Sequence, residues 1–166
     1  MNKEDRRKEA ASAEDKVIDA IKRSLPNKLV VRTHERYSEV DGFTVNRDTH
    51  AVESVFEVKC RNLSMPDLMG KFRCSITIAS NKLNSMQKLS EHMKIPSILY
   101  TYTMMDGCLF ALQITNKNGA WTCRRVESAE KEVPATVGGE PVIRNMSDIS
   151  VAGCTIVSVN GWTGVI

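Results

Sequence analysis

Residues 51–60, AVESVFEVKC, decide how the rest of this chain is interpreted. Strands bury valine readily, whereas Glu57 and Lys59 belong to residue types that are seldom buried without a partner. Successive side chains of a strand point to opposite faces, so Glu57 and Lys59 share one face and Val58 points the other way, into the core. The stretch therefore predicts a strand that presents a carboxylate and an ammonium group together.

A hairpin partner for this strand lies just upstream. Residues 41–45, DGFTV, have the composition of a strand, and residues 46–50, NRDTH, are typical of a turn. If Asp41 lies opposite Glu57, the loop centres on Thr49. Asp is disfavoured in strands, so Asp41 has no easy structural explanation. Asp48, by contrast, lies in the turn, where Asp is favoured.

Converging carboxylates at this hairpin predict a metal site. The carboxylates of Asp41 and Glu57 would repel each other unless a cation lay between them, and hard oxygen ligands suit Mg²⁺ or Mn²⁺. The backbone carbonyl of Val58 could complete the ligand set, and Lys59 could orient or help deprotonate a water. Such a site hydrolyses phosphodiesters. The simpler alternative is a cross-strand ion pair on a half-exposed hairpin.

A helix is predicted before the hairpin. SAED, residues 12–15, has the form of a capping box at Ser12, and Pro26 ends an apolar stripe at Val17, Ile18, Ile21 and Leu25. The stripe, extended backwards at helical spacing, reaches Glu14. Glu14 either favours the helix start through the helix dipole or reaches into a site beneath the helix.

The remaining pattern predicts an α/β (α+β) fold with a central mixed sheet flanked by helices. We expect a strand over 29–36, a helix over 81–94 with Leu83, Met86, Leu89 and Met93 inward, a hairpin over 95–114 and a strand over 120–126. Residues 61–80 are expected to be loop-like, with a short strand or helix entry at 75–80. The expected divisions are a mobile charged arm (1–12), a core domain (13–126) and a C-terminal extension (127–166) with one strand around 154–159.

Composition favours a soluble cytoplasmic protein. The chain of 166 residues has 42% hydrophobic residues and no stretch near the roughly 20 apolar residues that span a bilayer. Its charged start lacks the apolar region of a signal peptide, so no membrane association is expected. The five cysteines contain no CxxC pair, which argues against a zinc site or a disulfide framework.

Basic residues gather between residues 59 and 94, where seven Lys and Arg residues stand against two acidic ones. A cationic segment beside a phosphodiesterase site would suit DNA. The candidates for DNA contact are Lys71, Arg73, Lys82 and Lys88. On charge alone, a solvated helix face is the simpler interpretation.

These motifs together resemble the PD-(D/E)XK nuclease superfamily, especially its Holliday-junction-resolvase and phage or restriction-type branches. The similar segments are AEDKVIDAIKRSL (13–25), VVRTHERYSEVDG (30–42), VFEVKCRN (55–62) and KLNSMQKLSEHMKIPSILYTYTMMDG (82–107). The resemblance implies a restriction-endonuclease-like core and Mg²⁺- or Mn²⁺-dependent DNA cleavage. It assigns the first-helix glutamate to Glu14, the central aspartate to Asp41, and the E-x-K motif to Glu57 and Lys59.

The next helix of many family members offers a Lys or Gln to the active site, which implies a role for Lys82, Gln87 or Lys88. Val40 stands where the literal motif has proline. The expected function is a metal-dependent DNA endonuclease, with branched DNA such as a Holliday junction as one candidate substrate and a homodimer as the expected assembly. The alternative is a nucleic-acid-binding module that keeps the fold but does not cut.

Overall fold

A mixed six-stranded sheet forms the centre of the computed structural model, which describes residues 3–33, 38–134 and 141–159. The strand order is β1-β2-β3-β5-β6-β9. These strands are β1 (Lys28–Arg32), β2 (Gly42–Asn46), β3 (Val52–Arg61), β5 (Ser97–Thr103), β6 (Cys108–Thr115) and β9 (Thr155–Val159). Helices α1 (Lys3–Ser24) and α3 (Ser80–Met93) pack on the sheet, which confirms the predicted mixed sheet flanked by helices.

The β2–β3 hairpin has the predicted pairing. Gly42 pairs with Phe56 and Phe43 with Val55, so the register continues to place Asp41 beside Glu57. A register shift follows Thr44, and the turn at 47–50 is stabilised by the Asn46 side chain, whose Oδ1 accepts hydrogen bonds from two backbone N–H groups. An Asn that bonds its own backbone in this way explains where the chain reverses.

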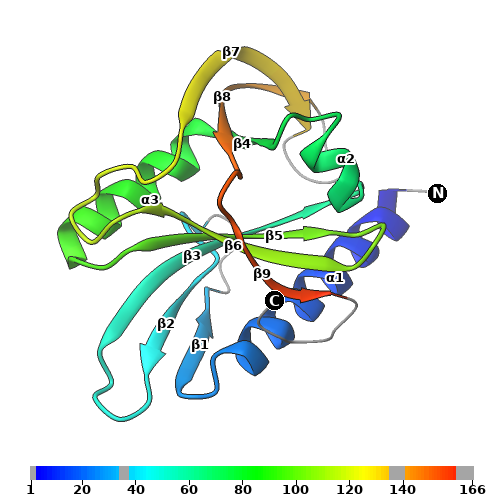
Figure 1. Cartoon of the computed structure of the whole chain (residues 1–166). Helices are drawn as coiled ribbons and strands as arrows, with labels where there is room; N and C mark the ends of the chain where they lie inside the picture. Colours follow the sequence, from blue (N-terminus) through cyan, green and yellow to red (C-terminus); the bar gives the residue numbers. More distant parts are fainter. Residues whose placement is uncertain (1–2, 34–37, 135–140, 160–166) are drawn as a thin grey trace.

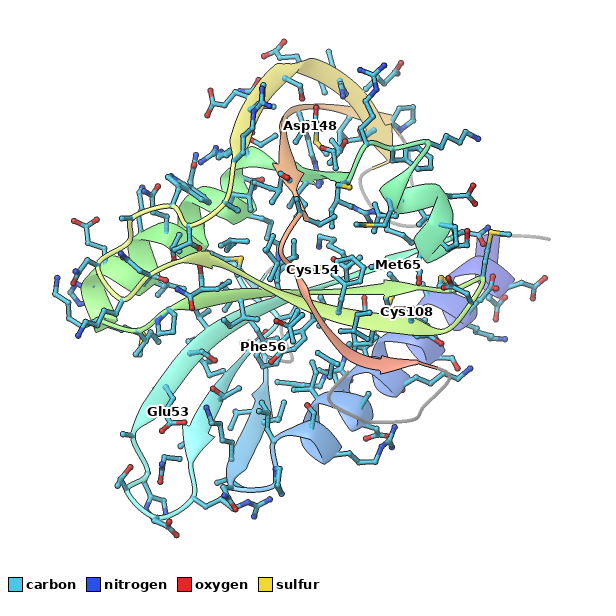
Figure 2. All side chains as sticks on the ribbon, in the orientation of Figure 1. Glu53, Phe56, Met65, Cys108, Asp148 and Cys154 are labelled. Atoms are coloured by element: carbon cyan, nitrogen blue, oxygen red, sulfur yellow. The ribbon has the colours of Figure 1, made fainter. Side chains whose placement is uncertain are left out.

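Helix α1 covers one face of the sheet. Its predicted apolar stripe is confirmed: Val17, Ile18 and Ile21 are buried against Phe56 and Val58 of β3. Figure 1 shows α1 on one side of the sheet and α3 on the other. Phe56, labelled in Figure 2, is completely buried, and its ring makes an edge-to-face contact with Tyr100 at a centroid distance of 5.8 Å.

Helix α3 covers the opposite face and connects two parallel strands. β3 and β5 pair in parallel, from Val55 with Ser97 to Arg61 with Thr103. Parallel neighbours need a crossover connection, and α3 is the longest element in it. Leu83 and Met86 of α3 are buried in the same apolar cluster as Val55. The side chains of β3 that point to this face therefore include Val55, Glu57 and Lys59.

A small second sheet packs above α3 with the order β4-β8-β7. Its strands are β4 (Ser75–Ala79), β7 (Arg125–Pro134) and β8 (Pro141–Ser150), and α2 (Met65–Met69) precedes them. Arg61 at the end of β3 donates a hydrogen bond from Nη2 to the Thr77 carbonyl at 2.7 Å, which ties the two sheets together. Asp148 of β8, labelled in Figure 2, accepts from Thr77 Oγ1 at 2.5 Å.

Three expectations about the ends of the core were wrong. Helix α1 begins at Lys3 rather than Ser12, so residues 3–12 extend the helix and are not a separate arm. Glu4 and Lys8 form an ion pair at 2.9 Å with helical i,i+4 spacing, so the charged sequence supports the helix instead of opposing it. Residues 127–134, expected to be loop, belong to β7, and the expected strand over 120–126 begins only at Arg125.

Other boundaries also differ. The strand expected over 29–36 ends at Arg32, and residues 34–37 lie outside the described part of the chain. Residues 65–69 form α2 where a loop was expected, and 75–79 form the strand β4 that was one of two alternatives. Met93, expected to point inward, is 38% exposed at the end of α3. The strand expected around 154–159 is confirmed as β9. No helix within the described residues is long and apolar enough to cross a membrane.

Candidate metal-dependent active site

Asp41 is held at the point where β1 and β2 separate. Its backbone N–H donates to the Phe56 carbonyl at 3.1 Å, and its own carbonyl accepts from the Thr33 N–H at 3.0 Å. Its side chain is also fixed, because Oδ2 accepts from the backbone N–H of Val58 at 2.7 Å. The N–H and C=O of one strand residue point to the same side. The Val58 carbonyl therefore lies on the same edge of β3 as Asp41.

Glu57 is a buried carboxylate, with only 1% of its side chain exposed. Oε1 accepts a hydrogen bond from Lys59 Nζ, as the shared strand face predicts. Burial raises the pKa of Glu57, and the negative charge of Asp41 acts in the same direction, while Lys59 and Lys82 oppose both. A carboxylate without cationic neighbours would be very costly in this position.

Lys82 enters the site from the first turn of α3. Its Nζ lies 3.4 Å from Glu57 Oε2 and 3.9 Å from Asp41 Oδ1, and it donates to the Ser38 carbonyl at 2.8 Å. Lys82 was one of several basic candidates for DNA contact, and the structure places it between the two carboxylates. The sequence analysis did not anticipate the contact with Ser38.

The four oxygens of the Asp41 and Glu57 carboxylates divide into two pairs according to their partners. One oxygen of each carboxylate is occupied by an adjacent protein group: Asp41 Oδ2 by the Val58 N–H, and Glu57 Oε1 by Lys59. The other two, Asp41 Oδ1 and Glu57 Oε2, both face the Lys82 ammonium. Two acidic oxygens from different strands thus converge on one point, and a cation already lies there.

Glu14 reaches the edge of this site from α1. Its side chain is about half exposed, at 51%, and Oε2 lies 3.6 Å from Arg32 Nη2. Partial burial raises the pKa of Glu14, the charge of Asp41 raises it further, and Arg32 and Lys59 lower it. Glu14 is therefore close enough to Asp41 for the two charges to repel each other. Of the two readings of Glu14, the approach to a site agrees with its position, since helix α1 begins far upstream of it.

A pocket of about 250 Å³ lies beside the cluster and is lined by Asp41 and Lys82, but not by Glu57 or Lys59. Its lining comes from α1, the end of β1, the segment before β2, β3 and α3, through Glu14, Ile18, Arg32, Thr33, Ser38, Asp41, Val58 and Lys82. Arg32, Thr33 and Ser38 were not among the predicted site residues. The strand was expected to continue to residue 36, so only the structure shows that it ends at Arg32 and that Arg32 meets Glu14.

The donor set suits a small divalent cation. Within the described residues, no group of three or more His, Cys, Asp and Glu side chains is close enough to hold a metal ion. Mg²⁺ is commonly bound by only one or two carboxylates, together with waters and substrate phosphates. Asp41, Glu57 and the Val58 carbonyl fit that requirement, and the convergence of Asp41 Oδ1 and Glu57 Oε2 on a cationic group shows where negative potential is concentrated.

Other candidate residues lie outside this pocket. Gln87 donates from its amide to the Gly119 carbonyl at 3.0 Å, which fixes a turn and not a substrate. Lys88 is exposed on α3 and lines a separate, larger hollow of about 640 Å³ with Glu39 and His92. Lys71 and Arg73 are exposed in the turn between α2 and β4. Their role in DNA contact remains a prediction.

Comparison with known proteins adds no assignment: the chain matches no protein-family model, and no curated protein is similar to it in sequence.

Proposed function

We propose that this protein is a divalent-metal-dependent DNA endonuclease with a restriction-endonuclease-like core. The observation that carries the proposal is the convergence of Asp41 and Glu57, from adjacent strands, beside Lys59 and Lys82. A purely structural ion pair needs one carboxylate and one cation. Here a nearly inaccessible glutamate, a second carboxylate and two lysines are collected in one cluster, and two of its members, Asp41 and Lys82, line a pocket at the surface.

The elements behind the resemblance to PD-(D/E)XK nucleases also support the proposal. The first helix, the aspartate before the first strand of the β2–β3 hairpin, the E-x-K motif and the following Lys-bearing helix all contribute to one pocket through Glu14, Asp41, Val58 and Lys82. These four residues come from four different segments of the sequence. Their meeting is what a shared active site requires.

The residues have distinct roles in the proposed reaction. Asp41, Glu57 and the Val58 carbonyl would hold Mg²⁺ or Mn²⁺, and the bound ion would supply Lewis-acid stabilisation of charge on the phosphate. Lys59, beside Glu57, orients the attacking water and donates hydrogen bonds to the developing oxyanion. Glu14, at the rim, accepts hydrogen bonds from water entering the pocket. The buried position of Glu57 keeps bulk water away from its charge.

Cleavage of labelled DNA tests this function. Linear, nicked, flapped and four-way substrates are incubated with the protein in Mg²⁺, Mn²⁺, Ca²⁺ or excess EDTA. We expect cutting in Mg²⁺ and Mn²⁺, none in EDTA, and binding with little cutting in Ca²⁺, whose looser coordination positions water poorly. Undiminished cutting in EDTA would contradict the proposed metal dependence.

Binding without cutting under all metal conditions would favour the alternative, a nucleic-acid-binding module that keeps the fold. A preference for four-way DNA would support the junction-resolving activity over the other substrates. A homodimer that cuts two strands symmetrically is a further part of the proposal, and light scattering of the purified protein measures it.

A further inference from the structure

The Lys82 ammonium occupies the point at which a metal ion would be bound. Asp41 Oδ1 and Glu57 Oε2, which no backbone group or Lys59 engages within the described part of the chain, lie 3.9 and 3.4 Å from Lys82 Nζ. Mg²⁺ takes oxygen ligands at about 2.0–2.1 Å, so an ion shared by these oxygens and the ammonium exclude each other. Metal binding therefore requires Lys82 to move.

The charges at this point are balanced without a metal. Asp41 and Glu57 contribute two negative charges, and Lys59 and Lys82 contribute two positive ones. A divalent ion added to this arrangement leaves an excess of positive charge beside the nearly inaccessible Glu57, which is unfavourable. Phosphate groups of a nucleic acid supply the negative charge that restores the balance.

Lys82 has a route into the pocket, although it must give up its hydrogen bond to the Ser38 carbonyl to take that route. The side chain of Lys82 is 27% exposed, lines the open pocket and comes from a different element than either carboxylate. A lysine side chain is flexible, with four carbons between its backbone and its ammonium. Lys59 is on the same strand as Glu57 and contacts that carboxylate alone among the described ion pairs.

We propose that Lys82 is a resident counter-ion that competes with the metal for Asp41 and Glu57, and that nucleic-acid phosphates draw it away. Metal and DNA then bind cooperatively: each ligand raises the affinity of the other by the same factor. This inference rests on the proposed function and adds its regulation. It means that free protein holds the metal weakly and that the metal site is completed when DNA arrives.

Mn²⁺ binding, followed by the electron paramagnetic resonance signal of the free ion, tests the inference without measuring catalysis. The DNA is a four-way junction built from phosphorothioate strands, which resist cleavage and present both duplex arms and a branch. Wild type and Lys82→Met are measured with and without it. Lys82→Met keeps an unbranched apolar side chain and removes the charge together with the hydrogen bond to the Ser38 carbonyl.

In the wild type, the junction should tighten Mn²⁺ binding on the order of tenfold. Lys82→Met alone should already bind Mn²⁺ on the order of tenfold more tightly than the wild type alone, with little further gain from the junction. Lys22→Met is the matched control, because Lys22 pairs with Asp19 and lies eight residues along α1 from Glu14, roughly 12 Å along the helix axis. It should behave like the wild type.

Two results would overturn the inference: a wild type whose Mn²⁺ affinity is unchanged by the junction, or a Lys82→Met variant that binds Mn²⁺ no more tightly than the wild type. The first needs no variant, so it decides the question even if Lys82→Met does not fold. Lys82→Gln, checked by circular dichroism, is the second neutral variant. If wild type cuts DNA with Mn²⁺ but either result is found, only the inference fails. If wild type neither binds Mn²⁺ nor cuts, the proposed function fails with it.

Discussion

The carboxylate of Asp41 accepts a hydrogen bond at 2.7 Å from the backbone N–H of Val58, the residue between Glu57 and Lys59. One peptide unit therefore positions the aspartate relative to both members of the E-x-K motif. A side chain that is fixed in this way needs no reorganisation when it takes a ligand, which is the condition for efficient electrostatic catalysis.

Asp41→Asn should lower the rate of DNA cleavage by orders of magnitude while leaving DNA binding intact or tighter. Asparagine can still accept the Val58 hydrogen bond, but it removes one negative charge from the proposed metal site. Asp48→Asn is the matched control, because Asp48 is exposed in the β2–β3 turn and its backbone N–H bonds to Asn46. Single-turnover cleavage with a gel-shift control measures both. An inactive Asp48→Asn beside an active Asp41→Asn would contradict the proposed site.

Lys88→Ala should reduce the salt dependence of DNA binding. Lys88 is exposed on α3 and lines the separate hollow with Glu39 and His92, so it is accessible to a phosphate of DNA that extends beyond the proposed active site. Loss of one phosphate contact lowers the slope of log affinity against log salt by about 1. Gln87→Ala serves as the comparison, since Gln87 bonds to Gly119 and should leave the slope unchanged. Equal slopes for Lys88→Ala and the wild type would show that Lys88 contacts no phosphate and belongs to a solvated helix face.

Gly42→Ala should destabilise the fold at the site itself. A β-carbon at Gly42 would lie well inside van der Waals contact with the Val31 carbonyl oxygen and the Phe56 ring, and neither can move freely because both belong to the sheet. Overpacking of this kind costs about 1–3 kcal/mol of the free energy of unfolding, occasionally more. The displacement would also shift the adjoining Asp41.

Urea denaturation monitored by circular dichroism measures this cost. Gly70→Ala is the control substitution, because its β-carbon would meet only the Pro66 carbonyl oxygen, at 3.2 Å. We expect the midpoint for Gly42→Ala to fall clearly below that for Gly70→Ala. The same midpoint for both variants would show that the sheet accommodates a methyl group at residue 42.

The Cys60 thiol should react slowly in the native protein. Burial raises its pKa from 9.0 to about 11, and the nearby charge of Glu14 adds to the effect. Since only the thiolate is nucleophilic, the reactive fraction near pH 8 should be roughly a hundredfold lower than in the unfolded chain. The raised pKa of Cys60 also affects stability. As the pH rises, the thiol loses its proton first in the unfolded chain, which favours unfolding. The contribution of Cys60 to the free energy of unfolding is therefore lost as the pH rises from 9 towards 11.

Iodoacetamide labelling near pH 8, with the modified peptide identified by mass spectrometry, measures the reactivity of Cys60 in native and urea-unfolded protein. Similar labelling rates in the two states would show that Cys60 is solvated in the native protein.

The hairpin and half of the site could be predicted from the sequence because local rules determine them. Strand periodicity places Glu57 and Lys59 on one face, and the turn chemistry of Asn46 fixes the loop that brings Asp41 opposite them. The buried side of α1 follows from spacing alone. These features depend on contacts between residues near in sequence, or on a single repeating period.

The position of Lys82 could not be predicted in the same way. It lies next to Leu83 at the boundary between the buried and exposed sides of α3, so its charge suited a solvated face equally well. Its contact with Glu57 depends on where the crossover sets α3 over β3, which spacing does not encode. The β7 strand was missed for a different reason: its charged residues Glu127, Glu130 and Glu132 are exposed, so it has no apolar alternation.

Because β9 pairs with β6 and lies near the end of the given sequence, the central sheet is completed late in synthesis. Asp41, Glu57, Lys59 and Lys82 leave the ribosome long before Thr155–Val159, the strand that covers the edge of β6 and lies against α1. Until then β6 presents an unpaired row of N–H and C=O groups, a template for pairing with another growing chain. Domains generally fold as units, so a nascent chain carries every residue of the proposed active site without the finished sheet that holds them in place. The proposed cutting activity would then begin only after the end of β9 has been synthesised.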